Sequence, residues 1–257
     1  MAIGRLIPCW RSKYWRMAVV VWVFSGGGEA EVRGFFPFLE KTFPGCRFER
    51  KTPVRQKPGP KANKAGSYGR TGQSLIEQIK QELPIALKAE ANKCDLILVF
   101  DDLDCRDSQT QKSKILVELS KIPECADIEK FVGFAAPEIE AWIIADWNNS
   151  IAKHSDFRRG KRHERMRWWL STQRKVSFEN PEAFSEYDAE KDCCREKLSE
   201  YLIESSVQDE LDRDKARFSK GDHTPLLLRE IDPNEVQKKC PLFRELYNYL
   251  NNFCRCP

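Results

Sequence analysis

The sequence lacks the cysteine spacing of a zinc site. Ten cysteines occur among 257 residues, but no Cys-x-x-Cys is present, and the three histidines lie away from the close pairs Cys193–Cys194 and Cys254–Cys256. A structural zinc site needs paired ligands at short spacing. We therefore predict no zinc and interpret the cysteines as reduced thiols of a cytoplasmic protein, several of them packed in the core.

The sequence also lacks an apolar run long enough to span a membrane. A basic stretch precedes the apolar residues 17–24, but no small-residue cleavage site follows and Gly26–Gly28 interrupts the run, so a signal peptide is not indicated. We interpret 17–24 as the first core strand and residues 1–16 as an extension or a misassigned translation start. The net charge of +4 permits nucleic-acid binding without requiring it.

Apolar stretches alternate with helical patterns between residues 17 and 148. Strands are predicted at 18–24, 46–49, 95–100 and 130–135. Helices are predicted at 29–41, 73–91, 109–121 and 138–147, the last opened by Pro137 at its first turn. This alternation predicts an α/β core with a small parallel sheet flanked by helices. Residues 149–257 are predicted to be a helical C-terminal region packing on the core, with 233–253 its clearest amphipathic helix.

Three carboxylates end the apolar run that begins at Leu96: Asp101, Asp102 and Asp104. Open α/β sheets place their ligand crevice at the carboxyl ends of such buried strands. Asp102 and Asp104 occupy alternate positions, from which two carboxylates can share one hard divalent cation. A solvated strand-to-loop turn, with Asp as turn former, explains this stretch equally well.

A glycine turn, Ser25-Gly26-Gly27-Gly28-Glu29-Ala30-Glu31, lies between the first strand and the first helix. Glycines there permit close backbone approach to a ligand, and a helix N-terminus favours an anion. The turn matches neither a Walker loop nor a dinucleotide fingerprint. From this segment alone, Glu29 and Glu31 are more simply explained as first-turn acids that interact with the helix dipole.

The helix predicted at 138–147 carries a carboxylate on its apolar face. Glu140 shares that face with Ile143 and Ile144, so its side chain must be paired, protonated or metal-bound. We favour a role in a site over a buried hydrogen bond to nearby backbone. Glu138 and Asp146 lie on a different side, where a solvated helix edge is the simpler interpretation.

Two basic segments are candidates for phosphate contact. The loop 51–71 is rich in Pro, Gly, Lys and Arg, and we predict that its nucleic-acid contacts come from Lys57, Lys61, Lys64 and Arg70. A solubilising loop explains the composition equally well. In the second segment, 158–174, we expect the basic face to point outward and Trp168 and Trp169 to pack inward.

Several segments together resemble Toprim-like domains. Residues 23–29 (VFSGGGE) resemble their Glu-Gly-x-x-Glu opening, and residues 100–105 (FDDLDC) resemble their Asp-x-Asp strand end. Residues 135–146 (AAPEIEAWIIAD) resemble a segment of one uncharacterised bacterial Toprim-like family. That family is related to the nuclease domain of OLD (overcoming lysogenisation defect) proteins and often occurs in anti-phage or mobile loci. Residues 218–220 and 240–244 resemble its tail, so the resemblance extends from about 17 to 250.

The resemblance implies a Toprim-like fold with Mg²⁺ or Mn²⁺ held by Asp102 and Asp104, Asp101 being the alternative one residue earlier. The first glutamate of such domains falls at Ser25, and a hydroxyl is no general base near neutral pH unless it is activated. The retained acid, Glu29, is then the expected substitute. The tail match implies that Lys220 approaches the site and stabilises charge on a phosphate.

We therefore expect a metal-dependent nuclease or related phosphodiester-processing protein, with Glu29, Glu140 and Lys220 as its catalytic residues and nucleic acid as its partner. The alternative is a catalytically degenerate binding module that acts as partner of an ATPase. Ser25 favours the alternative, whereas the density of acids at 101–104 favours the enzyme. A structural α/β protein whose acids only cap loops is a third interpretation.

Overall fold

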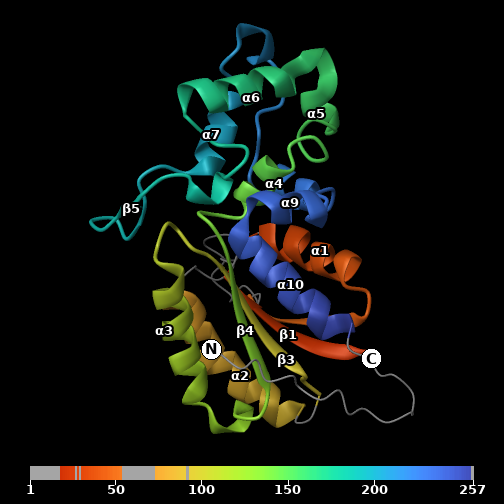
Figure 1. The fold of residues 1–257 in the computed structure, drawn as a ribbon, viewed down its shortest axis with the longest axis vertical. Helices are drawn as coiled ribbons and strands as arrows, with labels where there is room; N and C mark the ends of the chain where they lie inside the picture. Colours follow the sequence, from red (N-terminus) through yellow and green to blue (C-terminus); the bar gives the residue numbers. More distant parts are fainter. Residues whose placement is uncertain (1–17, 27, 29, 54–72, 91–92, 256–257) are drawn as a thin grey trace, which may run out of the picture.

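The computed structural model describes residues 18–26, 28, 30–53, 73–90 and 93–255. At its centre is a sheet of four parallel strands in the order β2-β1-β3-β4 (Figure 1). These strands are β1 (Val19–Ser25), β2 (Cys46–Thr52), β3 (Leu96–Asp102) and β4 (Glu129–Ala135). The predicted α/β class with a small parallel sheet flanked by helices is confirmed.

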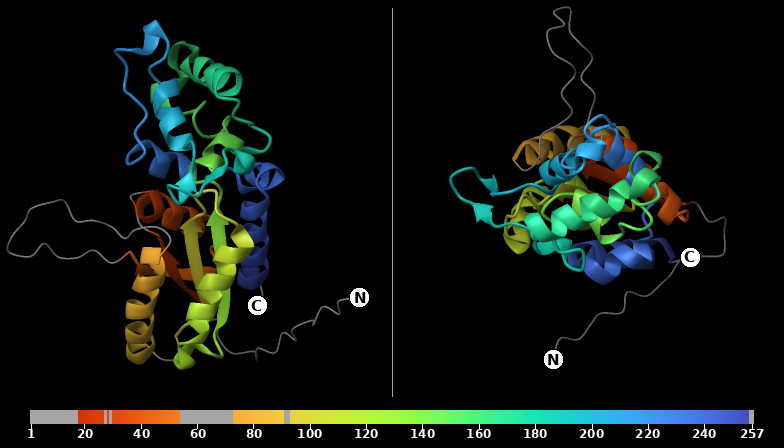
Figure 2. Two further views of the ribbon diagram at one scale, coloured as in Figure 1. Left: turned by 90° about the vertical axis from the view of Figure 1, so that its left-hand side faces the viewer. Right: turned by 90° about the horizontal axis from the view of Figure 1, so that it is seen from above.

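Helices cover both faces of the sheet (Figures 1 and 2). One face packs against α2 (Gln73–Ala89) and α3 (Ser108–Ser120), and the other against η1 (Glu31–Phe35), α1 (Phe36–Thr42) and α10 (Pro241–Arg255). The central strand β3 is buried along its whole length, as expected for a parallel strand covered on both sides. Its side chains alternate between the two cores: Leu98 and Phe100 face α1, whereas Ile97 and Val99 face α2.

The rest of the chain forms a second region beyond the carboxyl ends of the strands (Figure 2). Its helices are α4 (Glu140–Ala145), α5 (Ser155–Arg158), α6 (Arg162–Gln173), α7 (Leu198–Ser205), α8 (His223–Leu228) and α9 (Pro233–Lys239). Short turns of 3₁₀ helix in this region are η3 (Arg159–Lys161), η4 (Pro181–Ala183) and η5 (Glu210–Asp212), whereas η2 (Pro123–Cys125) joins α3 to β4 at the other end of the sheet. A small antiparallel pair, β5 (Tyr187–Asp188) and β6 (Cys193–Cys194), corrects the prediction that this region is helical throughout.

Two predicted helices have different boundaries because of proline. Pro137 does not open α4, which begins at Glu140; instead its carbonyl accepts a hydrogen bond from the Asp104 amide at 2.9 Å. Pro241 divides the helix predicted at 233–253 into α9 and α10, since proline ends one helix and suits the first turn of the next.

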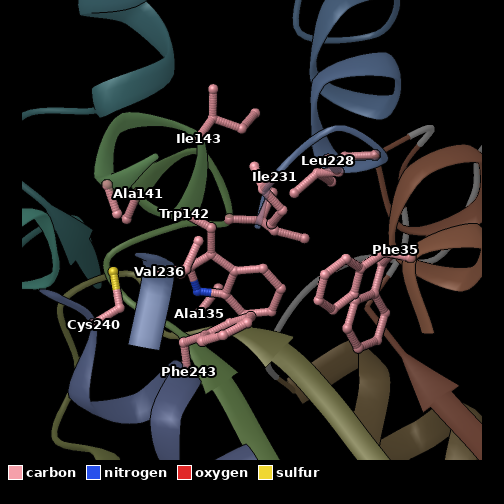
Figure 3. Close-up of a cluster of buried hydrophobic side chains, with 14 of the residues drawn as sticks. Phe35, Ala135, Ala141, Trp142, Ile143, Leu228, Ile231, Val236, Cys240 and Phe243 are labelled. Carbon is pink, nitrogen blue, oxygen red and sulfur yellow. The ribbon is translucent and has the colours of Figure 1, made fainter. Parts of the chain in front are cut away.

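Trp142 anchors α4 at the centre of the larger hydrophobic core (Figure 3). Its ring centroid lies 4.8 Å from that of Phe243 and 5.4 Å from that of Phe100, so it joins the returning helix α10 to strand β3. Every residue of α4 is buried, which is typical of a helix enclosed on all sides. The carboxylates at the start of α4 are therefore fixed relative to the sheet.

The cysteines correct the prediction of reduced thiols. Among the described residues there are two disulfides, Cys46–Cys254 and Cys105–Cys194, with sequence separations of 208 and 89 residues. Cys94, Cys125, Cys193 and Cys240 are free. Partners so far apart in sequence leave no spacing motif, so these bonds depend on the tertiary fold. In the described part of the chain, no helix is both long and apolar enough to cross a membrane.

Candidate metal centre

Four carboxylates and one lysine converge beyond the carboxyl ends of β1 and β3. They come from separate elements: Glu31 from η1, Asp102 from β3, Glu138 and Glu140 from the start of α4, and Lys220 from the segment before α8. Each of the four acids is at most 9 % exposed. We call this group the acidic cluster.

Strand alternation decides which aspartate of β3 joins the acidic cluster. Asp102 follows Phe100 by two residues and therefore lies on the same face of the sheet, toward α4 and η1. Its Oδ1 accepts the backbone N–H of Ile139 at 3.0 Å. By the same alternation Asp101 lies on the opposite face, that of Ile97 and Val99. The choice between Asp101 and Asp102 thus falls on Asp102.

Asp104 does not share a partner with Asp102, which corrects the predicted pair. Its carboxylate binds the guanidinium of Arg106 at 3.2 Å, and that guanidinium also binds Asp192. The chain has left the strand at this point, since Asp104 adopts a left-handed backbone with φ of 49°. Strand β3 ends at Asp102, so the alternation of side chains assumed for Asp102 and Asp104 does not extend to Asp104.

Glu140 has the environment expected of a residue in a site. It is fully buried, and its Oε1 accepts the hydroxyl of Thr224 at 2.8 Å. Its Oε2 is buried without a hydrogen-bond partner among the described residues, and the nearest charge is Nζ of Lys220 at 3.2 Å. One carboxylate oxygen is therefore left for a ligand or a proton.

Glu138 is buried rather than at a solvated helix edge, and the same correction applies to Asp146. The Glu138 carboxylate accepts the N–H and the hydroxyl of Ser199 at 2.7 and 2.9 Å, and it binds Nζ of Lys220 at 2.8 Å. Asp146 instead accepts the N–H of Asp232 and takes no part in the acidic cluster. Sequence spacing along α4 gave no sign of these partners, because all of them come from later segments.

Glu31 is a member of the acidic cluster that the motif comparison missed. The predicted acid, Glu29, lies outside the described residues. Glu31 is 6 % exposed, and a Cβ added to Gly28 would lie 3.0 Å from its Oε2. The glycine turn therefore serves to let the backbone approach this carboxylate closely. The sequence offered only its position, three residues after Gly28, because its burial depends on the tertiary fold.

Ser25 ends β1 on the same face as Asp102. Its hydroxyl donates to the carbonyl of Thr52 at 3.3 Å, and the Thr52 hydroxyl donates back to the Ser25 carbonyl at 3.0 Å. This reciprocal pair ties β1 to β2 and does not activate the hydroxyl. A glutamate at this position would point toward the acidic cluster, a place that Glu31 fills from the next element.

Burial and mutual repulsion raise the pKa of three carboxyl groups. Burial raises the pKa of Glu140 to about 7, with Lys220 opposing and Glu138 adding to the effect. Burial likewise raises the pKa of Asp102 well above its usual range, and that of Glu31 is also raised. Glu138 differs: although burial opposes ionisation, Lys220 and Ser199 bring its pKa below the usual value.

Lys220 approaches the acidic cluster, as the tail match implied. Burial alone would lower its pKa, but the charges of Glu140, Glu138 and Asp102 raise it strongly, so the side chain is an ammonium ion. Its side chain is 41 % exposed, so this single cation lies between the buried carboxylates and solvent.

The acidic cluster offers the donor set of a hard divalent cation, but no three of its ligand atoms all lie within 4.8 Å of one another, so its side chains would have to close around an ion. Four carboxylates against one ammonium leave an excess of three negative charges when all are ionised. All the acceptors are oxygen atoms, the donor set preferred by Mg²⁺ and Mn²⁺. Such an ion would explain two features. Oε2 of Glu140 accepts no hydrogen bond within the described chain and has only the Lys220 ammonium beside it, and the backbone of Gly28 approaches the Glu31 carboxylate closely. Asp102, Glu31 and Glu140 would hold it.

A second group, His154, Asp156 and His223, also brings potential ligand atoms within 4.8 Å of one another. Its hydrogen bonds oppose metal binding. Nδ1 of His223 accepts the Ser219 N–H at 2.8 Å, so the proton of the neutral ring lies on Nε2, which contacts Asp156 at 3.2 Å. A metal-bound histidine normally donates its second N–H to an acceptor, the reverse of this arrangement. We assign these three residues to a structural hydrogen-bonded group.

The predicted phosphate contacts Lys57, Lys61, Lys64 and Arg70 lie outside the described residues. Of the other predicted site residues, the structure brings together Asp102, Glu140 and Lys220, and adds Glu31 and Glu138.

Comparison with known proteins identifies a family. The model of a domain of unknown function, DUF4276, matches residues 47–251, which include every member of the acidic cluster except Glu31. No curated protein and no solved structure matches the chain significantly. Because the match covers most of the sequence, the chain belongs to the DUF4276 family.

Proposed function

We propose that the chain is a Mg²⁺- or Mn²⁺-dependent phosphodiester-processing enzyme, a nuclease of Toprim-like type. The observation that carries this proposal is the buried excess of carboxylate at the carboxyl edge of a parallel sheet. Burying an unpaired charge is costly, and burying several together is more so. A cluster of this kind is retained where it has a ligand to hold, and perturbed carboxyl groups concentrate at functional sites.

When bound, the metal ion would activate water and stabilise the charge that develops on a phosphate. The residues of the chain would hold the ion and orient its ligands. Asp102 is oriented by the Ile139 amide and Glu140 by the Thr224 hydroxyl, so each presents its second oxygen in a fixed direction. Glu31 supplies the carboxylate that Ser25 lacks. This arrangement is compatible with the resemblance to Toprim-like domains and with a place in anti-phage or mobile loci.

Lys220 is suited to stabilise negative charge on a substrate, and Glu140 is suited to change its protonation near neutral pH. Lys220 is the exposed edge of the acidic cluster, so its ammonium group meets an incoming phosphate first and offsets negative charge there. In the metal-free protein burial raises the pKa of Glu140 to about 7, so this carboxyl group gains or loses its proton near neutral pH as a cation leaves or enters.

A degenerate binding module that partners an ATPase remains the second candidate function. Two observations favour it: the Ser25 hydroxyl is committed to Thr52, and Lys220 already bridges Glu138 and Glu140 as an internal cation. Such a protein would keep its fold without metal and would cleave nothing alone.

The test is a cleavage assay with supercoiled plasmid, single-stranded DNA and RNA, each with Mg²⁺, Mn²⁺ or EDTA. Asp102→Asn and Glu140→Gln remove one carboxylate each and preserve shape. Glu182→Gln is the matched control, because Glu182 is a partly buried acid with a pKa of about 7 that caps α10 through the amides of Leu242 and Phe243. We expect metal-dependent cleavage by wild type and the control, reduced about 10²–10³-fold in the cluster variants. Metal-independent cleavage, or none, would refute the enzyme.

A further inference from the structure

At the end of the molecule opposite the sheet, α5 and α6 lie near the segment that follows α7 (Figure 1), and exposed cations of these segments form a basic surface. Two segments contribute to it, 158–161 around η3 and 213–217 after η5. Its exposed cations are Arg158, Arg159, Lys161, Arg213, Lys215 and Arg217. We call these six residues the distal basic surface.

A buried arginine holds the two segments together. The guanidinium of Arg162 is fully buried and donates to the carbonyls of Asp156 at 3.1 Å and Ala216 at 2.7 Å. In addition, Nζ of Lys215 lies 4.0 Å from the position that a Cβ on Gly160 would occupy. The distal basic surface is therefore a fixed feature of the fold. The buried Arg162 also corrects the expectation that the basic residues of this stretch all point outward.

Half of these cations have no local counterion. Lys161, Arg213 and Lys215 pair with the neighbouring acids Glu164, Glu210 and Asp212. Arg158, Arg159 and Arg217 have no ion-pair partner within the described part of the chain. Exposed guanidinium groups bind phosphate in a bidentate manner, which makes arginine the preferred residue for phosphate recognition.

An exposed aromatic ring lies on α6, on the helix side that also carries Lys161. Trp168 is 60 % exposed, and it follows Lys161 and Arg165 at i+7 and i+3, on the same side of the helix. The prediction that it packs inward was wrong, whereas Trp169 is partly buried and contacts Tyr201. Exposed aromatic rings beside a basic track stack on the bases of single strands.

The chain itself connects the distal basic surface to the metal centre. Arg217 precedes Lys220 by three residues. Phe218, which follows Arg217, is buried in the core. Lys220 then binds Glu138 and Glu140. A polymer lying on Arg217 would therefore be directed along this segment toward the acidic cluster.

We propose that the distal basic surface binds single-stranded nucleic acid, with phosphates on Arg158, Arg159 and Arg217 and a base stacked on Trp168. As a substrate-docking surface it rests on the proposed function. The binding step itself uses no carboxylate and needs no metal ion.

Binding is measured by fluorescence anisotropy with a labelled oligothymidylate of about 20 nucleotides, in EDTA so that no cleavage occurs. The variant Arg158→Glu/Arg217→Glu takes one arginine from each segment. Its matched control is Lys88→Glu/Lys93→Glu, two exposed lysines near the end of α2. We expect the arginine variant to bind at least about tenfold more weakly. The slope of log K against log salt concentration should also decrease by about one to two, because about two phosphate contacts are lost.

The stacking contact is tested by Trp168→Ala, expected to weaken binding about tenfold, and by Trp168→Phe, expected to restore most of it. Unchanged affinity in the arginine variant, or equal loss in the lysine control, would overturn the proposal. So would binding to phosphatidylserine vesicles with none to the oligonucleotide. If wild type binds the oligonucleotide in EDTA but cleaves nothing in Mg²⁺, only the proposed enzymatic activity is refuted. If wild type cleaves and the arginine variant binds as tightly as wild type, only the proposed binding surface is refuted.

Discussion

Two groups of ionisable side chains meet at the start of α8, where His223 belongs to one and Thr224 donates to Glu140 of the other, and they differ in how their charges and hydrogen bonds are satisfied. In the group of His154, Asp156 and His223, each ring Nδ1 accepts a backbone N–H, and Asp156 pairs with His223. In the acidic cluster, three carboxyl groups have raised pKa values, and one buried oxygen of Glu140 has no hydrogen-bond partner within the described chain. The hydrogen bonds of the first group are satisfied within the group, whereas the second holds four buried carboxyl groups against one cation, Lys220. Ligand-like spacing alone is therefore weak evidence for a metal site, and the direction of the surrounding hydrogen bonds must also be considered.

The largest expected difference between the two groups is in activity. Asp102→Asn removes a carboxylate that the proposed chemistry uses, so we expect the metal-dependent cleavage rate to fall by about 10²–10³-fold. His154→Gln should leave that rate within about threefold, because its partners are structural. Both rates are measured by single-turnover cleavage with Mn²⁺. A larger loss in His154→Gln than in Asp102→Asn would reverse the assignment of the two groups.

The two groups should also respond to pH with opposite sign. Glu140 has a folded pKa of about 7 against about 4.5 unfolded, so its contribution to stability is complete below pH 4.5 and is lost as pH rises toward 7. This amounts to roughly 3 kcal/mol in the metal-free protein. The pKa values of Asp156 and His154 are lowered in the fold, so their contributions are instead lost as pH falls.

Chemical denaturation at several pH values in EDTA measures this dependence. Glu140→Gln should make the decrease between pH 4.5 and 7 smaller, because one of the titrating groups is gone while Asp102, Glu31 and Glu182 remain. The control Asp156→Asn should leave that decrease in place. If the free energy of unfolding of wild type instead rises steadily over this range, the burial-driven pKa shift of Glu140 is wrong.

A smaller effect should separate the members of the acidic cluster themselves. Asp102→Asn keeps an acceptor for the Ile139 amide while removing an unfavourable charge, so we expect the metal-free protein to be more stable by about 1–2 kcal/mol. Glu138→Gln breaks a buried pair with Lys220 and should destabilise by about 1–3 kcal/mol. Urea denaturation in EDTA compares them. Destabilisation by both variants would show that all four carboxylates are structurally paired.

The sequence predicted the sheet well because apolar runs and their alternation are local properties. Every strand of the central sheet was expected, and the placement of Asp102 on the face of Phe100 follows from the same period of two. Glu140 was predicted because three neighbours on its helix face are apolar. Local pattern could not predict Glu138 or Glu31, since their burial depends on Ser199, Lys220 and the backbone of Gly28.

The same limit explains the disulfides and the basic stretch 158–174. Cys105 and Cys194 meet only after the loop that follows β3 has packed against the β5–β6 hairpin. Arg162 is buried because carbonyl groups from two other segments surround it, which helical periodicity cannot show.

Calorimetric titration of Mn²⁺ into purified protein tests most directly whether the acidic cluster holds a cation. We expect one saturable binding event in wild type and in Glu182→Gln, weakened at least about tenfold in Asp102→Asn and in Glu140→Gln and unchanged in His154→Gln. No binding by wild type, or binding lost only in His154→Gln, would contradict the assignment and place any metal chemistry elsewhere in the molecule.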